Sequence, residues 1–195
     1  AYTEQLDRQR ADIRVKASIR NTDFTAFRGK VRLSLAPWFP QEGVPVATQE
    51  YEILTGQLDT FSLLLPVNNP KLWTPETPAL YQLTATLLDR QGVAVDDYVI
   101  TTGIRTVDQI GGQFRLNGKV SMLNGAQTFG FRAPVEDMIK NQRCAPAHWV
   151  AKELLQIKRM NGNLLRTHVH AWEFPARGTN DPRYAEYADQ LGIMI

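Results

Sequence analysis

The sequence predicts a mainly β fold joined to a shorter α/β segment, in which a β-sandwich precedes the first strand–helix units of an incomplete (β/α)8 barrel. In the first half, apolar and polar residues alternate with period two, and turn residues recur every ~8–12 positions, which is typical of a sandwich. The second half reads strand, helix, strand, helix, strand, which favours parallel strands joined by helical crossovers. We therefore expect the sandwich at residues 1–107 and the barrel part at residues 108–195.

Alternating side chains predict the strands of the sandwich. Ile13, Val15 and Ala17 interleave with charged residues, and a polar turn at Asn21-Thr22-Asp23 separates this stretch from the next. Such alternation indicates strands with one buried face. Strands are expected at residues 12–20, 30–35, 48–54, 60–65, 81–87 and 98–104, with Asp89-Arg90-Gln91-Gly92 as the last turn. About seven short strands of this kind predict an immunoglobulin-like arrangement.

A hairpin and a short strand open the second half. Asn117-Gly118 lies between strand-like residues at 114–120, and Asn-Gly is a strong signal for a tight hairpin turn. We expect a short strand at residues 121–127. A long irregular connection containing the only cysteine, Cys144, then precedes the first helix.

Two helices alternate with the remaining strands. The first is expected at residues 146–161, with Lys158 and Arg159 in its last turn, where cations suit the helix dipole. The second begins with Asp181 as N-cap and Pro182 at its first position, and Gly192 ends it. Strands are expected at 163–167 and 193–195. Since three strands do not close a barrel, we expect the chain to end inside a folding unit; a small α/β domain with a three-stranded sheet is the alternative.

Composition excludes several partners. The 22 basic and 20 acidic residues leave a net charge of +2, without the basic runs that nucleic acid or anionic membranes attract. No apolar run approaches the ~18–20 residues of a membrane span. One cysteine excludes an internal disulfide, and the N-terminal stretch lacks the apolar region of a signal peptide. Periplasmic, extracellular and cytoplasmic locations all remain compatible with the sequence.

Several stretches resemble glycoside hydrolase family 2. Residues 72–81, Leu-Trp-Thr-Pro-Glu-Thr-Pro-Ala-Leu-Tyr, are similar to a segment of that family's sandwich domain, and residues 103–105, Gly-Ile-Arg, to its end. Residues 114–119, Phe-Arg-Leu-Asn-Gly-Lys, resemble the hairpin that leads into the family's barrel. Residues 163–167 and 187–193 resemble its second barrel strand and the end of the next helix. The order and spacing of these stretches carry the resemblance over nearly the whole chain.

The resemblance implies a retaining exo-β-glycosidase of the β-galactosidase, β-glucuronidase or β-mannosidase type, with β-galactosidase as the first expectation. Such enzymes use two glutamates, and a retaining mechanism needs their carboxyls roughly 5–5.5 Å apart. The family carries the first glutamate in an Asn-Glu pair, which this sequence lacks. Glu136, Glu153, Glu173 and Glu186 match neither catalytic position. We therefore expect no catalytic residue here and no activity from this chain alone.

The resemblance also implies substrate-binding residues at the ends of the barrel strands, where barrel active sites lie. Arg166 matches the family's strand-two arginine and is expected in the active-site shell, with an interior salt bridge as the alternative. His168 and His170 follow it and are candidates to hydrogen-bond sugar hydroxyls. Trp172 offers an apolar face to a sugar ring. Gln127 keeps an amide on the first strand, where the family has an asparagine.

One departure from the family concerns the first barrel strand. Phe129 stands where the family has a histidine, which weakens the assignment of sugar contacts there. His168-x-His170 also resembles the His-x-His of zinc-dependent amidohydrolase barrels. That motif belongs on a first strand and needs further ligands, so we predict neither a metal nor a cofactor.

Competing functions remain at this level. A non-catalytic sandwich module for carbohydrate or protein binding is the main alternative, because sandwiches serve both roles. A zinc hydrolase built on His168 and His170 is a third. An incomplete barrel would expose strand edges and apolar helix faces, so self-association is expected. Trp73 is expected to plug the sandwich edge, and Trp149 to pack as core.

Overall fold

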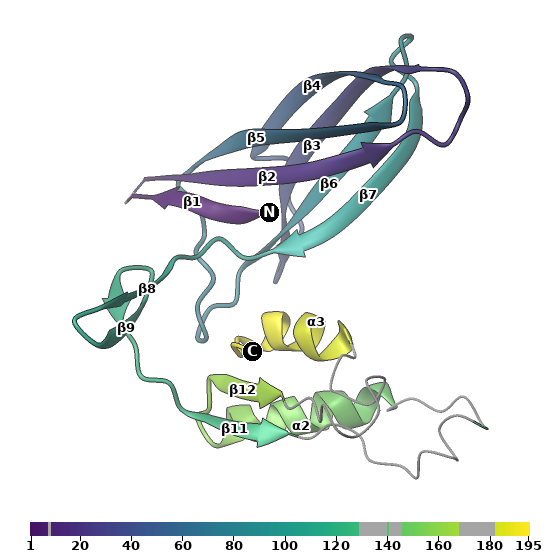
Figure 1. Ribbon diagram of the computed structural model, residues 1–195. Coiled ribbons are helices and arrows are strands. Elements are labelled where there is room, and N and C mark those ends of the chain that lie inside the picture. Colours follow the sequence, from purple (N-terminus) through teal and green to yellow (C-terminus); the bar gives the residue numbers. More distant parts are fainter. Residues whose placement is uncertain (8, 129–139, 141–145, 168–181) are drawn as a thin grey trace.

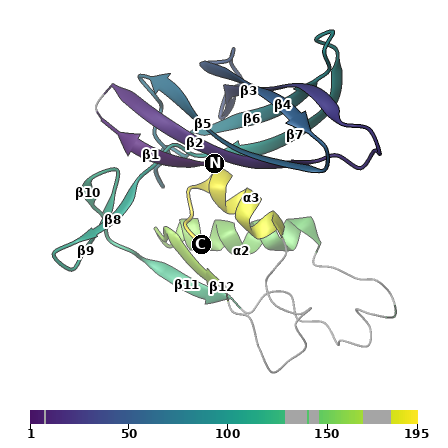
Figure 2. The same cartoon turned by 45° about the horizontal axis from the view of Figure 1, so that its top comes forward.

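The computed structural model describes residues 1–7, 9–128, 140, 146–167 and 182–195. Figure 1 shows a β-sandwich above a smaller part made of parallel strands and helices, with a β-hairpin beside the connection between them. The helix nearest the C-terminus lies between the sandwich and the other helix in both views (Figures 1 and 2). The two parts of the chain therefore pack on each other.

The sandwich consists of two antiparallel sheets. One has the strand order β1-β2-β5 and the other the order β4-β3-β6-β7. The predicted strands are present, and several are longer than the alternating stretches suggested. Their bounds are β1 Tyr2–Leu6, β2 Arg10–Arg20, β3 Phe27–Phe39, β4 Ala47–Thr55, β5 Leu58–Asn68, β6 Leu80–Leu88 and β7 Ala94–Thr102.

The sandwich core forms from the inward faces of both sheets. Ile13 on β2 lies opposite Leu65 on β5, and Leu33 on β3 lies opposite Ala85 on β6. The alternating apolar residues of each strand point inward because successive side chains of a strand point to opposite faces. Ile13, Leu33 and Leu65 are fully buried. The apolar residues of the predicted period-two pattern are therefore the residues that form the core.

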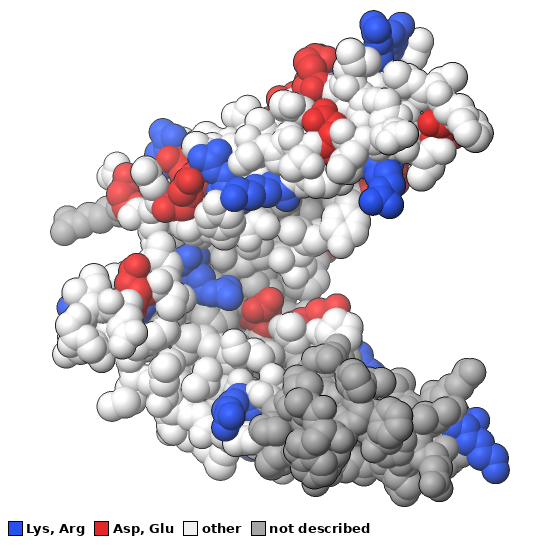
Figure 3. Space-filling view, in the orientation of Figure 1, with Lys and Arg blue, Asp and Glu red and all other residues white. Residues whose placement is uncertain are grey.

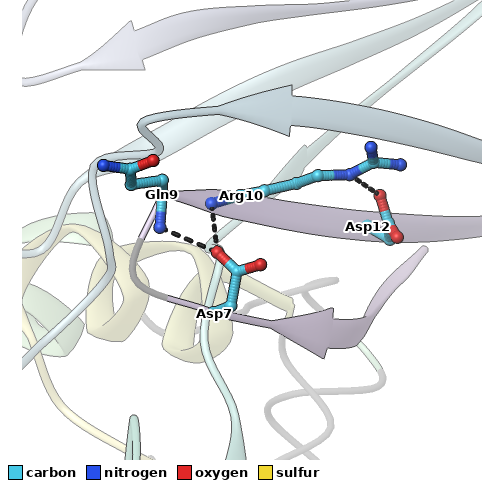
Figure 4. A network of polar contacts seen from close by, with 4 residues as sticks. All are labelled: Asp7, Gln9, Arg10 and Asp12. Atoms are coloured by element: carbon cyan, nitrogen blue, oxygen red, sulfur yellow. Dashed lines mark hydrogen bonds and ion pairs between the residues drawn. The ribbon is translucent and has the colours of Figure 1, made fainter.

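Strand β1 was not predicted, because its short sequence is mostly polar. It forms by pairing with β2, and Asp7, which follows β1, bonds to the start of β2. The Asp7 carboxylate accepts hydrogen bonds from the backbone N–H groups of Gln9 and Arg10, at 2.8 and 2.7 Å (Figure 4). These bonds hold the pKa of Asp7 below its ordinary value of 3.8. Neighbouring Arg10 pairs with Asp12.

The predicted Asn-Gly hairpin is confirmed. Strands β8 (Val107–Ile110), β9 (Gln113–Leu116) and β10 (Lys119–Val120) form a small antiparallel sheet. Asn117 and Gly118 both have positive φ, 52° and 74°, as a two-residue type I′ turn requires. The Asn117 side chain also bonds to Thr106 and to the carbonyl of Trp73, so the turn is tied to the sandwich.

The second part of the chain contains parallel strands with helices on one face. Strand β11 (Gly125–Thr128) pairs in parallel with β12 (Leu164–Thr167), and a parallel bridge joins Leu164 to Met194. Helix α2 (Ala147–Arg159) precedes β12, and helix α3 (Pro182–Leu191) precedes the bridge. The predicted alternation of strand and helix is present up to α3, but residues 193–195, predicted as a third strand, form only a single bridge at Met194. The described residues form part of a parallel sheet and no closed barrel.

Helices α2 and α3 pack on the same face of this sheet. Val150, Leu154 and Ile157 of α2 form a core with Tyr184 and Ala188 of α3, and Leu165 and Ile193 of the sheet join them. Gly192 ends α3 with a φ of +69°, as predicted for a glycine C-cap. The proposed N-cap, Asp181, lies outside the described residues, as does Cys144.

One prediction about tryptophan is wrong. Trp149 is not a core residue, since 54% of its surface is exposed at the start of α2, where it lies off the buried face. Trp73 is buried, at 1% exposure. It packs with Leu80 and Leu116 and reaches α3.

Candidate functional site

Two of the predicted site residues lie side by side on the parallel sheet. Gln127 of β11 is directly opposite Arg166 of β12 in the register. An Arg166 Nη1–H donates to Gln127 Oε1 over 3.1 Å, and both side chains are exposed. The guanidinium group keeps further donors for an acceptor beyond the pair. The arrangement can therefore present hydrogen-bond donors to a hydroxyl or a carboxylate.

The pleat of the strands explains where these side chains project. Ala126 and Leu165 belong to the core under the helices. Gln127 and Arg166, each one position further along, project from the opposite face. Both are close to the carboxyl ends of their strands. The carboxyl ends of parallel strands are where α/β proteins place ligand sites.

A second polar cluster lies on the helix side of the sheet. Thr128 Oγ1–H donates to Glu153 Oε1 over 3.1 Å, and the Tyr184 hydroxyl donates to Glu153 Oε2. Thr128 and Tyr184 are buried. The cluster connects the end of β11 with α2 and α3, so it fixes the strand end that carries Gln127. The Glu153 carboxylate is therefore bonded on the helix side of the sheet, whereas Arg166 projects from the opposite face.

Sequence reasoning did not find this cluster. Glu153 was considered only as a catalytic glutamate, and it matched neither position. Its partners are 25 and 31 positions away, so no local motif joins them. The available signal was its position on α2, next to buried Leu154 and three residues after buried Val150.

The other predicted site residues, His168, His170 and Trp172, lie outside the described residues. The zinc interpretation of the two histidines is therefore not tested. Among the residues that the structure does describe, no group of three or more His, Cys, Asp or Glu side chains is arranged to hold a metal ion. No described helix is long and apolar enough to cross a membrane.

A cavity of about 450 Å³ lies between the sandwich and the parallel sheet. Trp73 and Arg105 line it from the sandwich side, Asp189 from α3, and Leu164 and Met194 from the sheet. Figure 3 shows a notch in this region, with basic groups on the sandwich side and acidic groups facing them from α3. Burial raises the pKa of the Asp189 carboxyl, and the charge of Arg105 partly opposes the rise.

Comparison with protein families gives one family match. The family model described as glycosyl hydrolases family 2 matches residues 1–105. A β-galactosidase of Aeromonas hydrophila subsp. hydrophila is 31% identical over 151 residues, which is 77% of this chain and 13% of that protein. A β-galactosidase of Erwinia tasmaniensis is 28% identical over 190 residues, which is 95% of this chain and 17% of that protein. The chain thus spans less than a fifth of the length of either relative.

Solved structures show the same fold. A glycosyl hydrolase family 2 member from Bacteroides cellulosilyticus matches with a TM-score of 0.78 and 20% identity, over 98% of this chain and 24% of that one. A Bacteroides uniformis β-glucuronidase matches with a TM-score of 0.76 and 24% identity, over 98% of this chain and 21% of that one. These similarities extend over the sandwich and the parallel sheet together.

Proposed function

The chain belongs to glycosyl hydrolase family 2, and on that premise we propose that it is part of a retaining exo-β-glycosidase that hydrolyses terminal β-linked sugars. A β-galactosidase-like enzyme is the first candidate, because the curated relatives named above are β-galactosidases. The sandwich serves as scaffold, and the parallel sheet contributes to the sugar site.

The parallel sheet is proposed to be the opening of a (β/α)8 barrel. Its strands run parallel, and both helices cover one face. The opposite face carries the exposed Gln127–Arg166 pair, which is the observation that carries the proposal. In a barrel that face would point to the interior, and its strand ends would form the active-site floor.

Each proposed site residue has a role suited to its chemistry. Arg166 donates hydrogen bonds to a carboxylate of the site or to a sugar oxygen, and Gln127 holds the guanidinium in place from the neighbouring strand. His168 and His170 hydrogen-bond sugar hydroxyls, and Trp172 stacks on a sugar ring. The two glutamates that cleave the glycosidic bond belong to other parts of the enzyme, so the 195 residues alone are inactive.

Kinetic assays test this proposal. The protein that contains this chain should hydrolyse nitrophenyl β-galactoside with retention of configuration, and the 195-residue chain should not. Arg166→Ala in the full protein should lower kcat/KM by about 100-fold, the loss typical of one preorganised donor in an active site. Arg159→Ala, on the exposed last turn of α2, is the matched control and should leave kcat/KM unchanged.

Three outcomes would contradict the proposal. If the full protein hydrolyses no β-glycoside of a panel, it is not a β-glycosidase. Sugar binding without hydrolysis would favour the non-catalytic module instead. If the Arg166→Ala and Arg159→Ala variants have equal kcat/KM, Arg166 is not part of the active site.

A further inference from the structure

One segment of the sandwich reaches across to the parallel sheet. The indole N–H of Trp73 donates to the carbonyl oxygen of Asp189, near the end of α3, over 2.8 Å. Trp73 is only 1% exposed, and the Arg105 guanidinium lies 4.8 Å from the centre of its ring. A buried indole N–H needs an acceptor, and here the acceptor comes from the other part of the chain.

The same segment contacts the end of α2 through a lysine. Lys158 Nζ donates to the carbonyl oxygen of Pro75 over 2.9 Å and lies 3.5 Å from the carbonyl oxygen of Gly192. A carbonyl bonded to an ammonium group is a charge-assisted contact, which is stronger than one between neutral groups. Lys158 therefore joins the sandwich, α2 and the end of α3 at one point.

Gly192 allows this close approach. A Cβ at that position would lie 2.2 Å from the Pro75 carbonyl oxygen, and the φ of +69° also disfavours a side chain. The backbone of the sandwich segment thus packs directly on the backbone at the end of α3.

These contacts are at the two places where the chain leads into β12 and into residues 193–195. Lys158 is in the last turn of α2, before β12, and Gly192 immediately precedes Ile193, Met194 and Ile195. Residues 193–195 are joined to the start of β12 there, because Leu165 N–H donates to Met194 O and Met194 N–H donates to Asn163 O, both over 2.8 Å. Arg166 follows Leu165 directly.

We propose that the sandwich segment Trp73–Pro75 acts as a clasp that sets the position of β12 against residues 193–195, and that Lys158 is a positioning residue for Arg166. The clasp is a contact of this chain with itself, while the role of Arg166 in binding sugar rests on the proposed function. On this view the sandwich determines the geometry of the parallel sheet, in addition to joining it to the rest of the protein.

Amide hydrogen exchange on the 195-residue chain tests the clasp. Lys158→Met removes the ammonium group and keeps the apolar stem. Exchange at Leu165 and Met194 should accelerate about tenfold or more, the effect of losing one hydrogen bond to a charged group. Exchange at Leu33, in the sandwich core, should stay unchanged. Lys152→Met, on an exposed position of the same helix, is the control and should leave all three amides unchanged.

A conservative variant separates positioning from general destabilisation. Lys158→Arg keeps a cationic donor and should restore most of the protection at Leu165 and Met194. The clasp proposal is wrong if the amides of Lys158→Met exchange at the same rates as those of Lys152→Met. It is also wrong if exchange at Leu33 accelerates as much as exchange at Leu165 and Met194. No sugar enters this measurement, so its failure leaves the glycosidase proposal standing. Failure of the kinetic assays would likewise leave the clasp intact.

Discussion

Asp189 is a single residue whose ionisation should affect the stability of the whole chain. It lines the cavity beside Arg105, and burial raises its pKa above the ordinary value of 3.8. Because folding raises this pKa, the protonated carboxyl stabilises the folded state. That contribution to stability is complete below pH 3.8 and is lost as the pH rises through the folded pKa. At neutral pH the partly buried charge therefore costs stability.

We expect Asp189→Asn to increase the free energy of unfolding at neutral pH, because the amide needs no ionisation. The gain should disappear below about pH 3.8, where the wild-type carboxyl is protonated. Urea unfolding at both pH values measures the difference. Glu186→Gln, exposed on the same helix, is the control. A less stable Asp189→Asn protein at neutral pH would show that attraction to Arg105 outweighs burial.

Asp7 should behave in the opposite way. Its pKa is lowered by the backbone hydrogen bonds from Gln9 and Arg10, so its contribution to stability is present above pH 3.8 and lost as the pH falls through the folded pKa. A carbon-detected NMR titration should give a midpoint for Asp7 below 3.8. A midpoint at or above 3.8 would mean that these hydrogen bonds are not formed in solution.

At the scale of elements, the two faces of strand β3 should respond differently to truncation. Leu33 is fully buried between the sheets, and Leu33→Ala should cost about 2–5 kcal/mol of unfolding free energy. Arg32 points outward and pairs with Glu50, each with more than a third of its side chain exposed. Arg32→Ala should cost less than about 1 kcal/mol. Denaturant melts compare them, and similar losses would place the strand in another register.

The sequence predicted elements well where the pattern was local. The period-two strands and the Asn117-Gly118 turn follow from side-chain alternation and from φ preferences of two residues. Strand β1 was not predicted because Tyr2–Leu6 has only two partly buried positions, so its sequence shows no alternation. Its pairing with β2 decides its conformation. Strand β11 begins at Gly125 instead of residue 121, since Met122 and Asn124 hydrogen-bond to Asn161 and Asn163, which precede β12.

The candidate site also divides into residues that a sequence pattern predicts and contacts that depend on the packing of distant elements. Gln127 and Arg166 were predicted from the family pattern, and the parallel register brings them together. The cluster of Thr128, Glu153 and Tyr184 needed the packing of two helices on the sheet, which no stretch of sequence encodes by itself. Whether the domain boundary lies at residue 107 stays a prediction.

At the scale of the whole molecule, exposed apolar groups predict self-association. Leu123 and Ile195 are 41% and 54% exposed beside the cavity and the parallel sheet. Exposed apolar patches of this kind favour contacts between molecules. We expect the 195-residue chain to form dimers or larger species at micromolar concentration, measured by size-exclusion chromatography with light scattering.

Two double variants make this prediction specific. Leu123→Ser with Ile195→Ser should shift the chain toward monomer. Leu54→Ser with Leu58→Ser, both 60% exposed on the sandwich, should not. A wild-type chain that is monomeric at high concentration would refute the prediction, and an equal shift in both variants would place the contact elsewhere.

The bond between Trp73 and Asp189 also bears on how the protein is made. The two residues are 116 positions apart, so the acceptor is synthesised long after the donor. Domains generally fold in order as the chain leaves the ribosome, and the antiparallel sheets β1–β7 are complete by Thr102. For the time needed to translate the interval, the indole N–H of a nascent sandwich has no carbonyl from α3. That interval is when a chaperone or a neighbouring nascent chain would find the segment around Trp73 uncovered.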